Sequence, residues 1–215
     1  MTFLHPQSSS QGGPGAPFAD GNGKPLHLLP VGIEIEKKYR LDKRTLVELN
    51  AKLADLGAEF RSEVFEENYL HRGGLLDENA AVLRLRKIGD HSILTYKERF
   101  QADTEIKHRI EYETVVEDVY AMENIIQALG YKLSVVYEKH RKTWHFLDVE
   151  VVLDELPFGL YMEIEGEIEA IEEAEKVLGI QGLEPEPRGY PRLAVKYGEM
   201  VDGVSESRFE KKTQA

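Results

Sequence analysis

Charged and apolar residues alternate along most of the chain from Val31 onward. The segment GIEIEKKYRL, residues 32–41, has Glu34, Glu36, Lys38 and Arg40 at one parity and mostly apolar residues at the other. Successive side chains of a β-strand point to opposite faces. The pattern therefore predicts a strand with one charged face and one apolar face, and it raises the question of what lies opposite the charged face.

The same alternation predicts further strands over 58–70, 81–87, 92–98, 108–115, 131–146, 149–156 and 160–168. Leucines at helical spacing predict a helix over 43–57, which begins after Asp42 and ends at Gly57. Apolar spacing predicts two more helices, over 117–129 and 169–178. The short connections between strands favour antiparallel pairing over βαβ units.

The chain divides by composition into a tail, a domain and a second tail. Residues 1–30 are rich in Gly, Pro and Ser, which predicts a disordered N-terminal tail. The regular pattern predicts a folded domain over residues 31–200, and we expect residues 201–215 to form a flexible C-terminal tail.

Composition narrows the class of protein. Of the 215 residues, 41% are apolar and 31% are charged, which is typical of a soluble globular protein. No apolar run approaches the ~20 residues of a membrane span, and the N-terminus lacks a secretory pattern. The absence of cysteine excludes disulfides and thiolate metal sites and fits a cytoplasmic location. The net charge of −12 argues against binding to DNA or to anionic membranes.

The charged faces of the strands can be explained in two ways. In the simpler one, a sheet packs its apolar face on helices and exposes its charged face to water. However, like charges recur two residues apart, where side chains lie about 7 Å apart on one face and repel each other. These pairs are Glu34/Glu36, Glu163/Glu165, Arg84/Arg86 and Lys139/Arg141. A bound ligand or ion that offsets the repulsion is the second explanation.

The residue types indicate which ligand this would be. Carboxylates without His or Cys suit Mg²⁺ or Mn²⁺, whereas Arg and Lys suit phosphate oxygens. Eight antiparallel strands can close on themselves and place the charged faces inside. We therefore expect an α+β fold, an eight-stranded antiparallel β-barrel-like tunnel with a charged lumen and about three helices packed outside.

Six segments in order resemble the CYTH superfamily, the triphosphate tunnel metalloenzymes. They are EIEKKYRL, LRLRK, LTYKE, EKHRKTW, LDELPFGLYMEIEGE and RGYPRLAVK, and they span about residues 31–198. In the last segment Gly189 stands where the family pattern has Ser. The family includes class IV adenylyl cyclases, thiamine triphosphatases, inorganic triphosphatases and RNA triphosphatases.

The resemblance implies roles for individual residues. The implied metal ligands, together with Glu111 placed on the same face by parity, are Glu34, Glu36, Glu111, Asp154, Glu163 and Glu165. The implied phosphate-binding residues, with Arg109 added by parity, are Lys38, Arg84, Arg86, Lys97, Arg109, Lys139 and Arg141. Glu36, Lys38 and Glu165 are the catalytic candidates. Glu113 is also inward-facing by parity.

The leading functional prediction is a Mg²⁺- or Mn²⁺-dependent enzyme that hydrolyses a small triphosphate such as tripolyphosphate, thiamine triphosphate or a nucleotide. One alternative is a class IV adenylyl cyclase, which makes cyclic AMP and pyrophosphate from ATP. A second alternative is a non-catalytic module that binds polyphosphate. The expected partner is the small triphosphate, with no membrane or DNA, and the oligomeric state stays open, a homodimer included.

Overall fold

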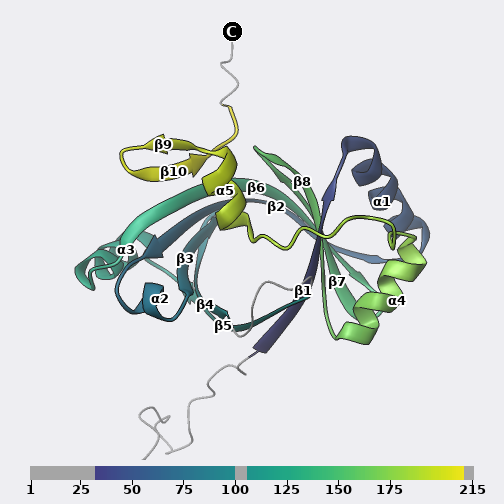
Figure 1. Ribbon diagram of the computed structural model, residues 1–215, viewed down its shortest axis with the longest axis horizontal. Coiled ribbons are helices and arrows are strands. Elements are labelled where there is room, and N and C mark those ends of the chain that lie inside the picture. Colours follow the sequence, from purple (N-terminus) through teal and green to yellow (C-terminus); the bar gives the residue numbers. More distant parts are fainter. Residues whose placement is uncertain (1–31, 100–105, 211–215) are drawn as a thin grey trace, which may run out of the picture. The chain divides into compact units, whose positions relative to one another are not determined.

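The computed structural model of the protein describes residues 32–99 and 106–210 (Figure 1). They belong to one unit that begins at Gly32. The tail predicted over residues 1–30 lies outside the described residues. The strands are β1 (Gly32–Leu41), β2 (Glu59–Arg72), β3 (Ala81–Ile88), β4 (His91–Arg99), β5 (Ile106–Val116), β6 (Lys132–Phe146), β7 (Val149–Leu156), β8 (Gly159–Glu165), β9 (Glu199–Val201) and β10 (Val204–Ser207). The helices are α1 (Lys43–Asp55), α2 (Leu75–Glu78), α3 (Val119–Ala128), α4 (Ile168–Leu178) and α5 (Tyr190–Tyr197).

The strands and helices with a clear sequence period lie where the sequence predicts them. The three expected helices correspond to α1, α3 and α4, and the eight expected strands to β1–β8. The described residues contain four further elements, α2, α5, β9 and β10. Of these, α2, β9 and β10 span only three or four residues, too few to show a period. The chain from residue 201 was expected to be loose, and this was wrong for the part that forms the end of β9 and all of β10.

All pairings among β1–β8 are antiparallel, as expected, while β10 lies parallel to β6. The order of the sheet is β2-β3-β4-β5-β1-β8-β7-β6-β10-β9, and β2 additionally pairs with β6. Each of β1–β8 therefore has a paired neighbour on both sides. The α+β class and the antiparallel sheet are confirmed. The expected tunnel is a claim about the space inside the sheet, which strand pairing alone does not establish.

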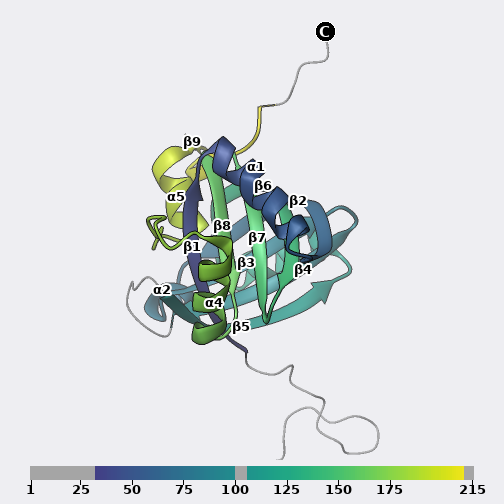
Figure 2. The same cartoon turned by 90° about the vertical axis from the view of Figure 1, so that its right-hand side faces the viewer.

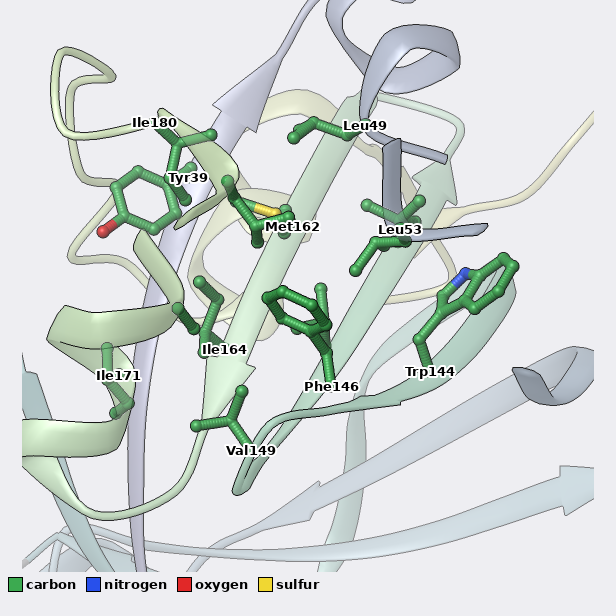
Figure 3. Packing of buried hydrophobic residues seen from close by; sticks show 14 of the residues in the cluster. Tyr39, Leu49, Leu53, Trp144, Phe146, Val149, Met162, Ile164, Ile171 and Ile180 are labelled. Atoms are coloured by element: carbon green, nitrogen blue, oxygen red, sulfur yellow. The ribbon is translucent and has the colours of Figure 1, made fainter. Parts of the chain in front are cut away.

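Helices α1 and α4 lie across the outer face of β1, β7 and β8 (Figure 2). Asp42 starts α1 by accepting a hydrogen bond from the Thr45 amide at 2.7 Å. Leu49 and Leu53 then point into a core that also contains Met162 and Ile164 of β8 (Figure 3). Burial of one such side chain contributes roughly 1.5–3 kcal/mol. The apolar side chains on the outer faces of these strands are therefore buried in this core.

A second cluster of buried residues packs around α5. Leu193 and Ala194 of α5 belong to this cluster together with Leu70 of β2, Val135 of β6 and Leu156 of β7. Tyr137, Tyr161 and Tyr190 complete it. Because Leu70 and Leu156 share the strand parity of inward-pointing charged residues, α5 borders the charged face of the sheet. No helix among the described residues is both long and apolar enough to cross a membrane.

Candidate functional site

Side chains from all eight strands β1–β8 meet on the face of the sheet opposite α1 and α4. Tyr39 and Met162 belong to the core beneath those helices, so their sequence neighbours Lys38 and Glu163 point the other way. Contacts between charged groups form one continuous chain. It begins at Lys38 on β1, passes through β8, β7, β6, β2 and β3, and ends on β4 and β5. We call this set the inner network, and its members are Lys38, Glu66, Arg84, Arg86, Lys97, Glu111, Glu113, Lys139, Arg141, Asp154 and Glu163.

Lys38 lies at the β1 end of the inner network and is almost fully buried. Its Nζ is 2.9 Å from Oε1 of Glu163, its register partner on β8. The same ammonium donates to the Arg188 carbonyl at 3.3 Å and lies 3.8 Å from the centre of the Tyr190 ring. The lysine of the Glu-x-Glu-x-Lys motif is thus fixed in position by three different groups.

Arg141 joins the acidic residues of β7 and β8. Its Nε donates to Oδ1 of Asp154 at 2.7 Å, and its Nη2 donates to Oδ2 of the same carboxylate. That nitrogen also lies 2.6 Å from Oε2 of Glu163. The Tyr190 hydroxyl donates to Oδ2 of Asp154 at 2.7 Å. Asp154 is fully buried, and its charge is met by two paired hydrogen bonds from one guanidinium, a geometry that is strong in a dry site.

Glu66 of β2 links the β6 and β3 parts of the network. Its carboxylate lies 3.3 Å from Nζ of Lys139 and 3.7 Å from Arg86. Burial alone raises the pKa of Glu66, but the charges of Lys139, Arg141, Arg86 and Arg84 outweigh it and bring the pKa down to about 2. Glu66 is therefore an anion enclosed by cations.

The β3–β5 end of the network contains the two arginines of LRLRK. Arg86 lies 2.9 Å from Glu113, and Arg84 lies 3.4 Å from the same carboxylate oxygen. The Thr95 hydroxyl donates to that oxygen at 2.6 Å. On the adjacent strands, Lys97 is 2.7 Å from Glu111. Both arginines thus lie side by side and can present their guanidinium groups to one ligand.

Burial and neighbouring charges also shift two other groups in the centre. Burial lowers the pKa of Lys139 to about 8, with repulsion from Arg141 acting in the same direction and Asp154 opposing it. Burial and repulsion from Glu36 both raise the pKa of Glu163. The positive charges of Lys38 and Arg141 outweigh these two effects and lower the pKa to about 2. Strong shifts of this kind often mark a functional site.

Glu36 and Glu165 are opposite each other in the register of β1 and β8. Glu36 is buried, whereas Glu165 is exposed. Because Mg²⁺ is commonly held by one or two carboxylates together with phosphate oxygens, this pair fits a hard divalent cation. Among the described residues, no three His, Cys, Asp or Glu stand close enough together to form a metal cluster.

Most predicted site residues belong to the inner network. The remaining four either lie next to it or have side chains that the structure does not describe. Glu36 and Glu165 are adjacent to it on β1 and β8. Glu34 and Arg109 are register partners on β1 and β5, but their side chains lie outside the described part of the structure. Asp154 was predicted to bind metal, and in this structure Arg141 and Tyr190 engage it.

The sequence prediction missed Glu66, Thr95 and Tyr190 as site residues. The parity of FEENYL could have pointed to Glu66, since Glu66 and Asn68 alternate with Phe65 and Glu67. The position of Tyr190 follows from how α5 packs, and no period in the sequence indicates that.

Comparison with known proteins identifies the family. The sequence pattern of the CYTH domain matches residues 32–190. This chain belongs to the CYTH domain family. The resemblance inferred from the motifs is confirmed, and the remainder of α5, β9 and β10 lies beyond the matched residues of the CYTH domain.

Relatives of this CYTH domain share most of its length. A protein from Methanocaldococcus jannaschii with the name "Putative adenylate cyclase MJ0240" is 33% identical over 150 residues, which are 68% of this chain and 83% of the relative. The PH1012 protein from Pyrococcus horikoshii OT3 is 25% identical, with a TM-score of 0.66 over 75% of this chain and 99% of the other. A Hippeastrum protein described as "Putative adenylyl cyclase HpAC1" with "a dominant triphophatase activity" shares the fold, at 19% identity and a TM-score of 0.60, over 79% of this chain and 98% of that one.

The free energy of unfolding of this CYTH domain should decrease at low pH, because Glu66 then becomes protonated. The folded-state pKa of about 2 lies below the ordinary value of 4.5. The stabilisation is therefore complete above about pH 4.5 and is lost as the pH falls toward about 2. We expect Glu66 to account for up to about 3 kcal/mol of the decrease in the free energy of unfolding over that window. Urea unfolding at several pH values measures this, and Glu66→Gln should flatten the dependence, whereas exposed Glu48→Gln should leave it unchanged.

Proposed function

We propose that this CYTH domain is a divalent-metal-dependent triphosphatase that hydrolyses a small triphosphate inside a tunnel formed by β1–β8. One observation carries the proposal. Five largely buried cationic side chains from three strands converge with carboxylates on a single face of the sheet, and they are Lys38, Arg84, Arg86, Lys139 and Arg141. Such a density of buried charge is costly for the fold alone, and a polyanionic ligand would compensate it.

The cations have complementary geometries for a chain of phosphates. Arg84 and Arg86 each present a planar fork that suits two phosphate oxygens, and they converge on the same Glu113 oxygen. Lys38 and Lys139 are compact point charges near the Tyr190 ring. On binding, phosphate oxygens would replace carboxylates as partners of these cations, and Lys97 and Arg109 would extend the site.

The carboxylates would hold Mg²⁺ or Mn²⁺. Glu36 and Glu165 are the first ligands that we propose, and Glu34, Glu111, Asp154 and Glu163 are additional acidic groups. When bound, the metal would neutralise phosphate charge and polarise a phosphoryl oxygen. Glu36 or Glu165 would orient water and accept its proton. Lys38 and the cations around it would stabilise the negative charge that develops on the leaving phosphate.

An assay of the purified full chain tests the proposal. The substrates are tripolyphosphate, thiamine triphosphate and ATP, each with Mg²⁺ or Mn²⁺ and each with excess chelator. We expect phosphate release from at least one substrate and loss of the release on chelation. No release from any of the three, or release that chelation leaves unchanged, would contradict the proposal.

A second candidate function is adenylyl cyclase activity, because the 33% identical relative has that name. The ribose 3′-hydroxyl of ATP would then attack the α-phosphorus, and pyrophosphate would leave. Detection of cyclic AMP and pyrophosphate in the ATP reaction would favour this function over hydrolysis. Tight binding of tripolyphosphate without metal and without turnover would favour a non-catalytic binding module.

A further inference from the structure

A second site lies outside the inner network, at the C-terminal end of the chain. A surface pocket of about 830 Å³ is bounded by the β7–β8 turn, the end of α5 and the β9–β10 hairpin. Much of its lining, from Tyr197 to Glu210, lies beyond the residues that match the CYTH domain. Figure 1 shows α5 beside the β9–β10 hairpin, both in yellow-green to yellow. We call this space the outer pocket.

Two stacked aromatic rings line the outer pocket. Phe158 and Tyr197 are nearly parallel, with 20° between their planes and 6.2 Å between their centres. Tyr197 is 41% exposed, so part of its ring is open to a ligand. An exposed ring of this kind offers a stacking surface for another planar aromatic group.

Two cations flank the same tyrosine. The guanidinium carbon of Arg40 is 5.7 Å from the centre of the Tyr197 ring, and Nζ of Lys196 is 4.8 Å from it. The hydrogen bond from Lys196, together with Arg40, lowers the pKa of Tyr197. Within the described residues, Arg40 and Lys196 form no ion pair with a carboxylate, in contrast to the cations of the inner network. Arg40, which lines the outer pocket, is therefore available to an anionic group beside these rings.

Three glutamates also line the outer pocket. Glu199 and Glu210 are exposed there, and Glu206 is held by Arg208 at 2.7 Å. Ionised carboxylates only accept hydrogen bonds. These carboxylates therefore suit a ligand with hydroxyl or amino donors.

The outer pocket is separated from the inner network by buried rings. The centre of the Tyr161 ring is 6.0 Å from the centre of the Phe158 ring and 5.5 Å from the centre of the Tyr190 ring. Tyr161 and Tyr190 are both buried, and Tyr190 contacts Lys38 of the inner network. A ligand in the outer pocket therefore does not occupy the inner site.

We propose that the outer pocket binds a nucleoside phosphate. The base stacks on Tyr197, the phosphate pairs with Arg40, and sugar hydroxyls or base amino groups donate to the carboxylates. This single ligand class combines the planar ring, the anion and the donors for which the pocket offers partners. The proposal goes beyond triphosphate hydrolysis, because binding here requires no turnover in the inner network.

Titration of the full chain with AMP, monitored by amide NMR signals, tests the proposal. We expect saturable shifts in residues 197–210, and we expect them to persist in a large excess of tripolyphosphate without divalent metal. Adenosine and ribose 5-phosphate should each bind at least about tenfold more weakly than AMP, since each lacks one of the two contacts. Shifts confined to inner-network residues, or their loss on adding tripolyphosphate, would overturn the proposal.

Variants of the pocket provide the second part of the test. Tyr197→Ala and Arg40→Ala should each weaken AMP at least about tenfold, whereas Tyr197→Phe, which keeps the ring, should bind as the wild type does. Tyr120→Ala is the matched control, because Tyr120 is an exposed tyrosine on α3 outside the pocket. Unchanged AMP affinity in the Arg40→Ala variant, or equal weakening in Tyr197→Phe and Tyr197→Ala, would also overturn the proposal.

Discussion

Replacement of Arg141 by methionine is expected to lower the free energy of unfolding by about 3–5 kcal/mol. Arg141 makes two hydrogen bonds to Asp154 and one to Glu163, and Asp154 has no exposed surface. Methionine would leave Asp154 without its main cation in a dry environment, while Glu163 would keep its contact with Lys38. Urea unfolding at pH 7 measures the loss, and the midpoint should fall while the slope stays similar.

Two further variants show whether the lower free energy of unfolding comes from a buried carboxylate that has lost its cation. Adding Asp154→Asn to Arg141→Met should recover part of the stability, because the buried negative charge is then removed. Arg44→Met breaks only the exposed pair with Glu48 and should cost less than about 1 kcal/mol. Equal destabilisation by the Arg44 and Arg141 variants would contradict the importance that we assign to the buried pair.

Lys139→Met is expected to lower the rate of triphosphate hydrolysis by about 10²–10³-fold, the typical loss when one group that stabilises developing charge is removed. The Lys139 ammonium is buried within 3.7 Å of both Glu66 and Asp154, at the centre of the proposed phosphate site. Phosphate-release kinetics on the best substrate measure the effect.

Lys142→Met is the matched control for this prediction. Lys142 is on the same strand three residues later and forms a partly exposed pair with Glu63, 3.5 Å away. Its replacement should leave hydrolysis within about twofold of wild type, as expected of an exposed pair. Similar losses in the two variants would indicate a general effect of lysine removal and would contradict a phosphate-binding role for Lys139.

The pH dependence gives an independent measure of the same lysine. The pKa of Lys139 is lowered by burial to about 8, so the free protein loses this positive charge as the pH rises through about 8. The affinity of wild-type protein for tripolyphosphate should decrease over that range, and the decrease should be absent in Lys139→Met. A decrease of the same size in both proteins would show that another group titrates.

The alternation of side chains along the strands predicted correctly which residues lie on each face of the sheet. The charged parity of β1 predicted that Glu36 and Lys38 face away from α1 and α4, and the structure shows Tyr39 packed under those helices instead. The same rule placed Arg84 and Arg86 together. Parity assigns a residue to a face but does not give its partners, so it could not show that Arg141 binds Asp154.

The missed features depend on tertiary packing. Helix α5 is eight residues long, and its apolar residues Leu193 and Ala194 are buried in a cluster that they share with Leu70 and Leu156, which are far away in the sequence. Tyr190 reaches Asp154 because α5 packs there. The β9–β10 hairpin ends in a pocket whose walls come from widely separated parts of the sequence.

The pairing of β2 with β6 has a consequence for how the chain reaches its native state. Glu59 is opposite His145, and β1 is paired with both β5 and β8. Contacts between residues so distant in sequence slow folding, because the intervening loop must close first. During synthesis on the ribosome, β2 lacks its complete β6 neighbour until 74 more residues, 73–146, have emerged, and in that interval its bare edge is open to chaperones or to other nascent chains.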